Sequence, residues 1–340
     1  MDQTGERIPS MECCRVIRQE KGRYRIVSRQ GEQDACVSGK FQHEAAVLSD
    51  YPAVGDYVMA DLNRQQTAVI HRVLPRKSVF LRRAAGTTHS EQVVAANIDI
   101  IFICMSLNLD FNLRRLERYL TAAWDGGAVP VIVLTKADLC NEAERQEKIL
   151  AAEQAAIGTD LICVSALEKN GYEPLKRYLS EGKTCAFVGS SGVGKSTMIN
   201  FLLGEARLAT NGLRNDDKGR HTTTHRELML LPGGAAVIDT PGMRELGIWD
   251  AEEGLDTVFE DIQALARNCR FHNCSHETEP GCAVQEALKN GTLSRSRWES
   301  YRKLNLENAY SQDAESYLAA KEKKFREIAK LNRKNAHRKR

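Results

Sequence analysis

A glycine-rich segment near the middle of the chain constrains the fold more than any other feature. It begins at Gly189 and ends in Lys195-Ser196, after the apolar run 184–188 and before the helix-forming segment 197–203. A strand, this motif and a helix in that order predict a phosphate-binding loop, in which glycines let backbone N–H groups surround phosphate oxygens. The alternative is a chance Gly-rich turn. The predicted phosphate-binding residues are Gly189, Ser190, Ser191, Gly192, Val193, Gly194, Lys195, Ser196 and Thr197.

Two residues of this loop have predicted chemical roles. Lys195 is expected to place a cation on the β- and γ-phosphates, and the Ser196 hydroxyl is expected to bind Mg²⁺ that accompanies the nucleotide. The N-terminus of the following helix adds partial positive charge. The loop by itself does not distinguish ATP from GTP.

A second motif indicates which base is bound. Thr135-Lys136-Ala137-Asp138 follows the apolar run 131–134. The Asp138 carboxylate can accept hydrogen bonds from N1–H and the N2 amino group of guanine, a donor pair that adenine lacks. The stem of Lys136 can lie along the base, and Ser165-Ala166, after the next apolar run, fits a loop whose backbone N–H meets guanine O6. A strand-to-helix turn capped by Asp138 is the alternative, but the phosphate loop in the same chain favours a GTP site.

A third motif, Asp239-Thr-Pro-Gly242, also follows an apolar run. Asp239 is expected to hold Mg²⁺ through water, and the Gly242 N–H to contact the γ-phosphate. Upstream, the threonines of 219–224 offer hydroxyls for a mobile loop, and the sequence does not decide which one binds Mg²⁺. Met243 cannot orient the attacking water, so slow intrinsic hydrolysis is expected. His221 is the candidate catalytic side chain, with His225 as rival and a surface histidine as the alternative.

The order of these motifs is unusual for a GTPase, because the guanine motif precedes the phosphate loop. A circular permutation explains this order. The apolar runs that carry the motifs are continuous rather than alternating, which predicts a parallel sheet covered on both faces. The motifs therefore predict a circularly permuted α/β P-loop GTPase domain at 86–250.

The flanking regions differ from this centre. Residues 1–85 contain several short strand-like runs separated by glycines and polar turns, which predict a small OB-fold β-barrel. Residues 251–340 are predicted to form a mainly helical domain, with a last helix from about 298 towards 330. A length of 340 residues suits such a multidomain protein. The polar N-terminus and the lack of an apolar run of about 18 residues predict a cytoplasmic protein without a membrane partner.

Four residues of the C-terminal region have the spacing of a metal site: Cys269, Cys274, His276 and Cys282. Three thiolates and an imidazole with no open position suit one structural Zn²⁺; free thiols beside a surface histidine are the alternative. Residues 321–340 contain ten Lys/Arg and two Glu, although the whole chain has a net charge of only +3. This basic end indicates either contact with a polyanion or a solvated tail.

The permuted order, the predicted barrel, the segment Gly219-Arg-His-Thr-Thr-Thr224 and the Cys/His cluster together resemble the RsgA/YjeQ family of bacterial GTPases. The resemblance spans nearly the whole chain. It implies a protein that binds GTP and GDP, zinc at the four cluster residues, the 30S ribosomal subunit and 16S rRNA. It also implies hydrolysis stimulated by the subunit late in its maturation. A monomer is expected, although the sequence does not determine the oligomeric state. Two other functions stay open at this point: an RNA-binding module with a passive nucleotide, and an ATP-dependent P-loop enzyme such as a kinase. A GTPase that acts on tRNA or a membrane is a weaker alternative.

Overall fold

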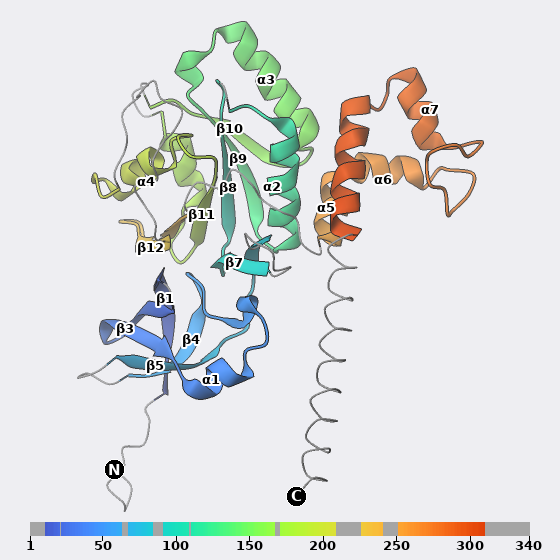
Figure 1. Ribbon diagram of the computed structural model, residues 1–340. Helices are drawn as coiled ribbons and strands as arrows, with labels where there is room; N and C mark the ends of the chain where they lie inside the picture. Colours follow the sequence, from blue (N-terminus) through green and yellow to red (C-terminus); the bar gives the residue numbers. More distant parts are fainter. Residues whose placement is uncertain are drawn as a thin grey trace, which may run out of the picture.

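The computed structural model describes residues 11–20, 22–62, 67–83, 91–108, 110–166, 171–208, 226–240 and 251–309. Three parts follow one another along the chain: a β-barrel, an α/β domain and a helical module beside the α/β domain (Figure 1). This architecture confirms the fold predicted from the sequence. The predicted boundaries at 85/86 and 250/251 adjoin segments outside the described residues and stay predictions.

The N-terminal part is a closed five-stranded barrel of the OB type. Its strands pair in the order β1-β2-β3-β5-β4, and β4 returns to β1. Alternate residues such as Val16, Ile26, Val58 and Ile70 fill the interior, as the period of two in a strand requires. The strands are β1 (Met11–Glu20), β2 (Arg23–Ser28), β3 (Gly31–Val37), β4 (Tyr57–Asp61) and β5 (Ala68–Val73), with the short helix α1 (Gly39–Glu44) and the 3₁₀ turn η1 (Leu48–Asp50) before β4.

The α/β domain is built on a sheet with the strand order β10-β9-β8-β11-β13-β12. The first five strands are parallel, as predicted, and β12 is antiparallel to β13, which the sequence analysis did not predict. Their bounds are β8 (Ile100–Ser106), β9 (Val129–Thr135), β10 (Asp160–Cys163), β11 (Thr184–Gly189), β12 (Arg226–Leu230) and β13 (Ala236–Asp239).

Helices cover both faces of this sheet, and the side chains of successive residues in each strand pack on opposite faces. On β8, Ile101 and Ile103 belong to the core beneath α2 (Leu113–Asp125) and α3 (Glu142–Ala155). Phe102 and Cys104 belong to the core beneath α4 (Lys195–Leu203) and the 3₁₀ turn η3 (Glu173–Tyr178). Burial on both sides explains why these strands are continuously apolar.

Backbone pairing joins the barrel to the α/β domain. Strand β1 pairs with β12, so one sheet runs through both parts. The two-stranded ribbon of β6 (Val79–Arg83) and β7 (Glu91–Ala96) lies at the same junction. A Cβ on Gly55 would lie 2.1 Å from the carbonyl oxygen of Ala96, so only glycine permits this approach. Arg15 adds a 2.7 Å hydrogen bond to the Thr184 hydroxyl.

The helical module contains α5 (Glu252–Val258), α6 (Glu260–Ala266), α7 (Ala283–Asn290) and a last helix described over 295–309. It packs against α2 on the side away from α4 (Figure 1). A Cβ on Gly254 would lie 2.1 Å from the carbonyl oxygen of Thr121. The backbones of α5 and α2 are therefore in direct contact.

A buried ionic network ties the last helix to α2. Arg297 donates to Glu117 at 3.0 Å and binds both carboxylate oxygens of Asp261 at 2.7 and 2.8 Å. The Ser300 hydroxyl also donates to Glu117, which is only 4% exposed. Burial raises the pKa of Glu117, and Ser300 and Arg297 partly oppose that rise. The network thus compensates charges that neither helix could bury separately.

Arg297→Met is expected to destabilise the module by about 3–5 kcal/mol, because it leaves the buried Glu117 carboxylate without its cation. Urea denaturation followed by the fluorescence of Trp124 and Trp298 measures the change. Arg114→Met is the matched control: its ion pair with Glu299 joins the same two helices at 3.3 Å, but both side chains are 56% exposed. Removing that pair should cost less than about 1 kcal/mol. Equal effects of the two substitutions would contradict a special role of the buried network.

Candidate nucleotide site and metal centre

The glycine-rich segment forms a loop between β11 and α4, as its sequence predicts. Gly189, Gly192 and Gly194 have φ values of +143°, +80° and +101°, a region that side chains with a Cβ rarely adopt. Gly189 also passes so close to β8 that a Cβ would lie 2.3 Å from the carbonyl oxygen of Cys104. Gly194 is the N-cap of α4, so the helix begins at Lys195.

Lys195 lies at the centre of this loop. Its Nζ donates to the carbonyl oxygens of Gly189 and Ser190 at 2.9 and 2.8 Å, and the residue is only 7% exposed. Burial lowers the pKa of Lys195, whereas Cys104, Asp239 and Asp110 act in the opposite direction. A buried ammonium group held by two carbonyl oxygens of the loop is suited to bind phosphate oxygens.

Asp239 ends β13 beside the loop and is 4% exposed. Burial raises its pKa to about 6, and the nearby Lys195 limits the rise. Next to it, the Thr240 hydroxyl donates to the carbonyl oxygen of Phe187 at 2.5 Å, which fixes the end of β13 on the strand that leads into the loop. A carboxylate at this position can hold a hydrated divalent cation.

The guanine motif joins the same edge of the sheet. The Thr135 hydroxyl donates to the carbonyl oxygen of Val193 at 2.7 Å, so the end of β9 is bonded directly to the phosphate loop. Lys136 has a φ of +58° and precedes the 3₁₀ turn η2 (Ala137–Leu139). Asp138 is exposed, and its Oδ1 accepts a 2.6 Å hydrogen bond from the Ser165 hydroxyl. Ala166, the residue after Ser165, is also exposed.

The structure therefore brings the motifs to the carboxyl ends of neighbouring parallel strands, where α/β proteins bind ligands. Two contacts within the site were not predicted: the bond from Thr135 to the phosphate loop and the bond from Ser165 to Asp138. The partners of these two hydroxyls lie 58 and 27 residues away in the chain, so sequence spacing does not reveal the contacts. His221, Gly242, Met243 and the threonines of 219–224 lie outside the described residues, as does the basic segment 321–340.

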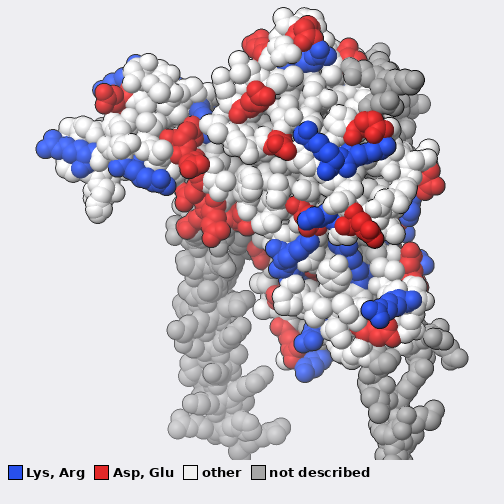
Figure 2. All heavy atoms as spheres, turned by 180° about the vertical axis from the view of Figure 1, so that it is seen from behind, with Lys and Arg blue, Asp and Glu red and all other residues white. Residues whose placement is uncertain are grey.

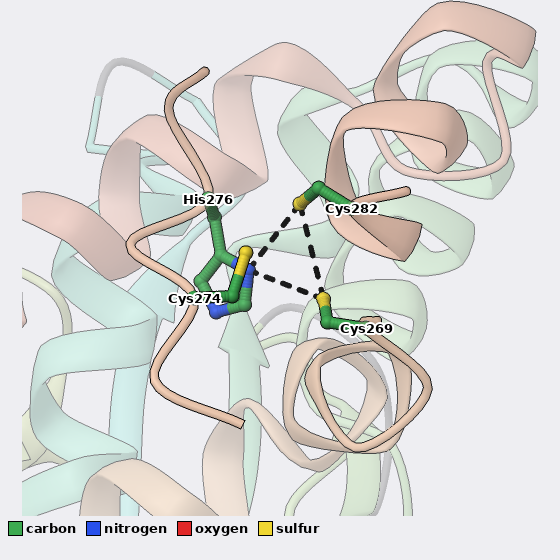
Figure 3. Close-up of side chains that lie close together, drawn as sticks. All are labelled: Cys269, Cys274, His276 and Cys282. Atoms are coloured by element: carbon green, nitrogen blue, oxygen red, sulfur yellow. Dashed lines mark hydrogen bonds between the residues drawn. The ribbon is translucent and has the colours of Figure 1, made fainter. Parts of the chain in front are cut away.

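Cys269, Cys274, His276 and Cys282 form a group that can hold a metal ion (Figure 3). Their candidate ligand atoms all lie within 4.8 Å of one another. His276 Nδ1 is 3.5 Å from the Cys269 sulfur and 3.4 Å from the Cys282 sulfur, and the two sulfurs are 3.8 Å apart. The prediction that these four residues meet is confirmed.

The surroundings of the cluster act differently on its thiols. Burial acts to raise the pKa of the Cys269 thiol, but hydrogen bonds with the Ala283 and Val284 N–H groups and with the Cys282 and Cys274 side chains together lower it. Both N–H groups belong to the first turn of α7, where the helix carries partial positive charge. Burial raises the pKa of the Cys274 thiol to about 11. His276 adopts a φ of +59°, and Gln285 fixes it by donating to its carbonyl oxygen at 2.5 Å.

The fold and the loop geometry define a P-loop GTPase whose strands are circularly permuted. A model of the RsgA GTPase family matches residues 73–249. The chain belongs to this family, and it is a GTP hydrolase.

Curated relatives align along most of the chain. "Small ribosomal subunit biogenesis GTPase RsgA 2" of Lactiplantibacillus plantarum is 51% identical over 87% of this chain and 83% of its own length. A protein of the same name from Vibrio vulnificus is 42% identical over 97% of this chain and 90% of its own length.

Two solved structures share the fold. YjeQ from Thermotoga maritima has a TM-score of 0.63 and 28% identity, and the match covers 87% of this chain and 98% of that protein. YloQ, described as a circularly permuted GTPase, has a TM-score of 0.58 and 22% identity over 93% of this chain and 98% of its own. Among the described residues, no helix is both long and apolar enough to cross a membrane.

Proposed function

We propose that this GTPase binds the small ribosomal subunit late in its maturation and hydrolyses GTP faster when the subunit is engaged. The main support is the set of aligned relatives, whose names specify small-subunit biogenesis. The proposed partners are the 30S subunit with its 16S rRNA, and the proposed location is the cytoplasm. Family membership favours GTP hydrolysis over a passive nucleotide or an ATP-dependent kinase.

The proposed GTP contacts are those predicted from the sequence. Residues 189–197 hold the phosphates, Asp138 with Lys136 reads the guanine, and Ser165-Ala166 supplies a backbone N–H to O6. Ser196 and Asp239 hold Mg²⁺, directly and through water. The support is the convergence of β9, β10, β11 and β13 on one edge, together with the hydrogen bond from Thr135 to Val193.

The proposed metal in the Cys/His cluster is a structural Zn²⁺. Zn–S and Zn–N bonds of about 2.3 and 2.05 Å in a tetrahedron imply ligand separations of about 3.8 Å between sulfurs and about 3.6 Å between sulfur and nitrogen. The separations here are 3.8 Å for the sulfurs of Cys269 and Cys282, and 3.5 and 3.4 Å from these sulfurs to His276. Three thiolates with one imidazole also match the donor preference of zinc.

The helical module is a candidate for rRNA contact. Figure 2 shows Lys and Arg along its outer part, whereas Asp and Glu gather where it meets the rest of the molecule. Arg267, Arg270, Lys289, Arg295 and Lys303 are exposed on the module. Such side chains suit phosphate contacts, whose strength falls as salt is added.

GTP turnover measured with purified 30S subunits, with 50S subunits and with neither tests the proposed function. We expect 30S alone to raise the rate at least about tenfold, which corresponds to about 1.4 kcal/mol of transition-state stabilisation. Equal rates in the three conditions would contradict the proposal while leaving intrinsic GTPase activity measurable.

The same assay tests His221 as the residue that supports the attacking water. His221→Ala should remove a factor of about 10²–10⁴ from the stimulated rate if the imidazole acts as a general base or orients the water. His225→Ala is the comparison, because this neighbour has the same chemistry. An unchanged stimulated rate in His221→Ala excludes the residue, and a loss only in His225→Ala transfers the role.

A further inference from the structure

Two arginines meet at the junction between the barrel and the α/β domain. Arg82 in β6 donates through Nε and Nη2 to the side-chain oxygen of Gln92 in β7, at 3.0 and 2.8 Å. Arg226, the first residue of β12, donates through Nη1 to the backbone oxygen of Val93 at 2.9 Å. Both guanidinium groups are thus held on consecutive residues of β7, the strand that lies between the two parts in Figure 1.

Within the part of the chain that the structure describes, neither arginine has an acidic partner. Among the described residues, every contact of the two guanidinium groups is to a neutral amide or carbonyl oxygen, and no ion pair includes them. Burial lowers the pKa of both side chains, and the charge of Arg82 lowers that of Arg226 further, so that it reaches about 10. Partly buried cations of this kind are costly unless an anion compensates their charge.

A cavity of about 260 Å³ adjoins the arginine pair. Gln92 and Val93, which hold the two guanidinium groups, also line this cavity. Gln19, which stands opposite Arg226 in the β1–β12 ladder, lines it as well, together with Tyr24 and Tyr51. The two arginines are not themselves lining residues, but each donates to a β7 residue that is.

We propose that the Arg82–Arg226 pair, with the cavity beside it, is a binding site for a phosphate group that is separate from the GTP site. Arg226 uses only one of its nitrogens in the described contacts, and a guanidinium group matches the oxygens of phosphate in a bidentate arrangement. The phosphate is either a phosphodiester of RNA, with the adjoining nucleotide in the cavity, or a free phosphate. The RNA source rests on the proposed function.

The position of Arg226 connects this site, through β12 and β13, to the proposed GTP site. Arg226 directly follows the segment 219–225 in sequence and begins the strand that pairs with β13, which ends at Asp239. An anion bound here would hold β12 between the barrel and the magnesium-binding side of the GTP site.

Binding measurements on the full chain saturated with Mg²⁺ and GDP test the site, because the phosphate loop is then occupied. One arm titrates a fluorescein-labelled single-stranded RNA, and the other compares thermal unfolding in phosphate and chloride at equal ionic strength. Arg226→Gln and Arg82→Gln should each lower the affinity for the anion about tenfold, equivalent to about 1.4 kcal/mol of binding free energy. For RNA, each should also reduce the slope of log K against log[salt] by about 0.7.

Arg25→Gln is the matched control, because this exposed barrel arginine is already paired with Glu32 at 3.2 Å. It should leave both arms unchanged. Weaker RNA binding with no phosphate effect assigns the site to RNA, and loss of a phosphate-specific stabilisation assigns it to free phosphate. Without phosphate, the unfolding temperature of the two variants should not fall, because each substitution removes one of two neighbouring positive charges. If the arginines had only a structural role, each substitution would lower the unfolding temperature. Wild-type RNA and phosphate binding in Arg82→Gln and Arg226→Gln would overturn the proposal.

Discussion

Asp138→Asn is expected to weaken GTP binding by roughly 10²- to 10³-fold and to create affinity for xanthosine triphosphate. In the proposed site the carboxylate accepts two hydrogen bonds from guanine, and charged hydrogen bonds of this kind contribute about 1.5–3 kcal/mol each. Asparagine presents one acceptor and one donor, which complement N1–H and the C2 carbonyl of xanthine. Competition of both triphosphates against a fluorescent GDP analogue measures the change.

Two controls make this experiment specific to the base. Asp160→Asn removes an exposed carboxylate from β10 and should leave GTP affinity unchanged. Ser165→Ala removes the 2.6 Å hydrogen bond that orients Asp138 and should cause a smaller loss without a gain in xanthosine triphosphate binding. If Asp138→Asn bound GTP as well as the wild type, Asp138 would not read the guanine.

Removal of the metal is expected to unfold the segment around the cluster while the α/β domain stays folded. Between 267 and 281 no residue is buried, so this segment has no apolar core of its own. Structural zinc contributes on the order of 10 kcal/mol of folding free energy in small modules. Treatment with a strong chelator, or Cys282→Ala, should therefore abolish the hydrogen-exchange protection of α7 and of the link from α6.

Metal content and hydrogen exchange are read on the same samples. The wild type should contain one zinc per chain and Cys282→Ala should contain none. Cys36→Ser, a change in a free cysteine of the barrel, should retain both metal and protection. Retention of zinc in Cys282→Ala, or undisturbed exchange after chelation, would show that the cluster does not hold this module together. GTP binding is expected to persist, because no ligand residue lies in the nucleotide site.

Both sites were predictable because their chemistry depends on local spacing. The glycines of the phosphate loop, the aspartate after β9 and the Cys/His cluster each reflect requirements that a short segment must satisfy by itself. Continuous apolar runs likewise predicted the parallel strands, since burial on both faces leaves a direct pattern in the sequence.

Contacts between distant segments had no such pattern. The antiparallel strand β12 is short and mixed in composition, and its pairing with β1 depends on how the barrel lies against the α/β domain. The contacts of Arg297 with Glu117 and of Arg82 with Gln92 each join side chains that resemble ordinary surface residues in sequence. The packing of the elements that carry these side chains determines which residues they contact.

The sequence by itself determined the class of nucleotide, the permuted order of the motifs and the four metal-ligating residues, because each is specified by residue type at a fixed short spacing. Only the tertiary structure decided that β1 extends the GTPase sheet and that α5 packs directly on α2. It also decided that Arg82 and Arg226 both donate to β7, with no acidic partner among the described residues. The physical reason is that side chains far apart in the chain become neighbours only when the apolar faces of whole elements are buried together.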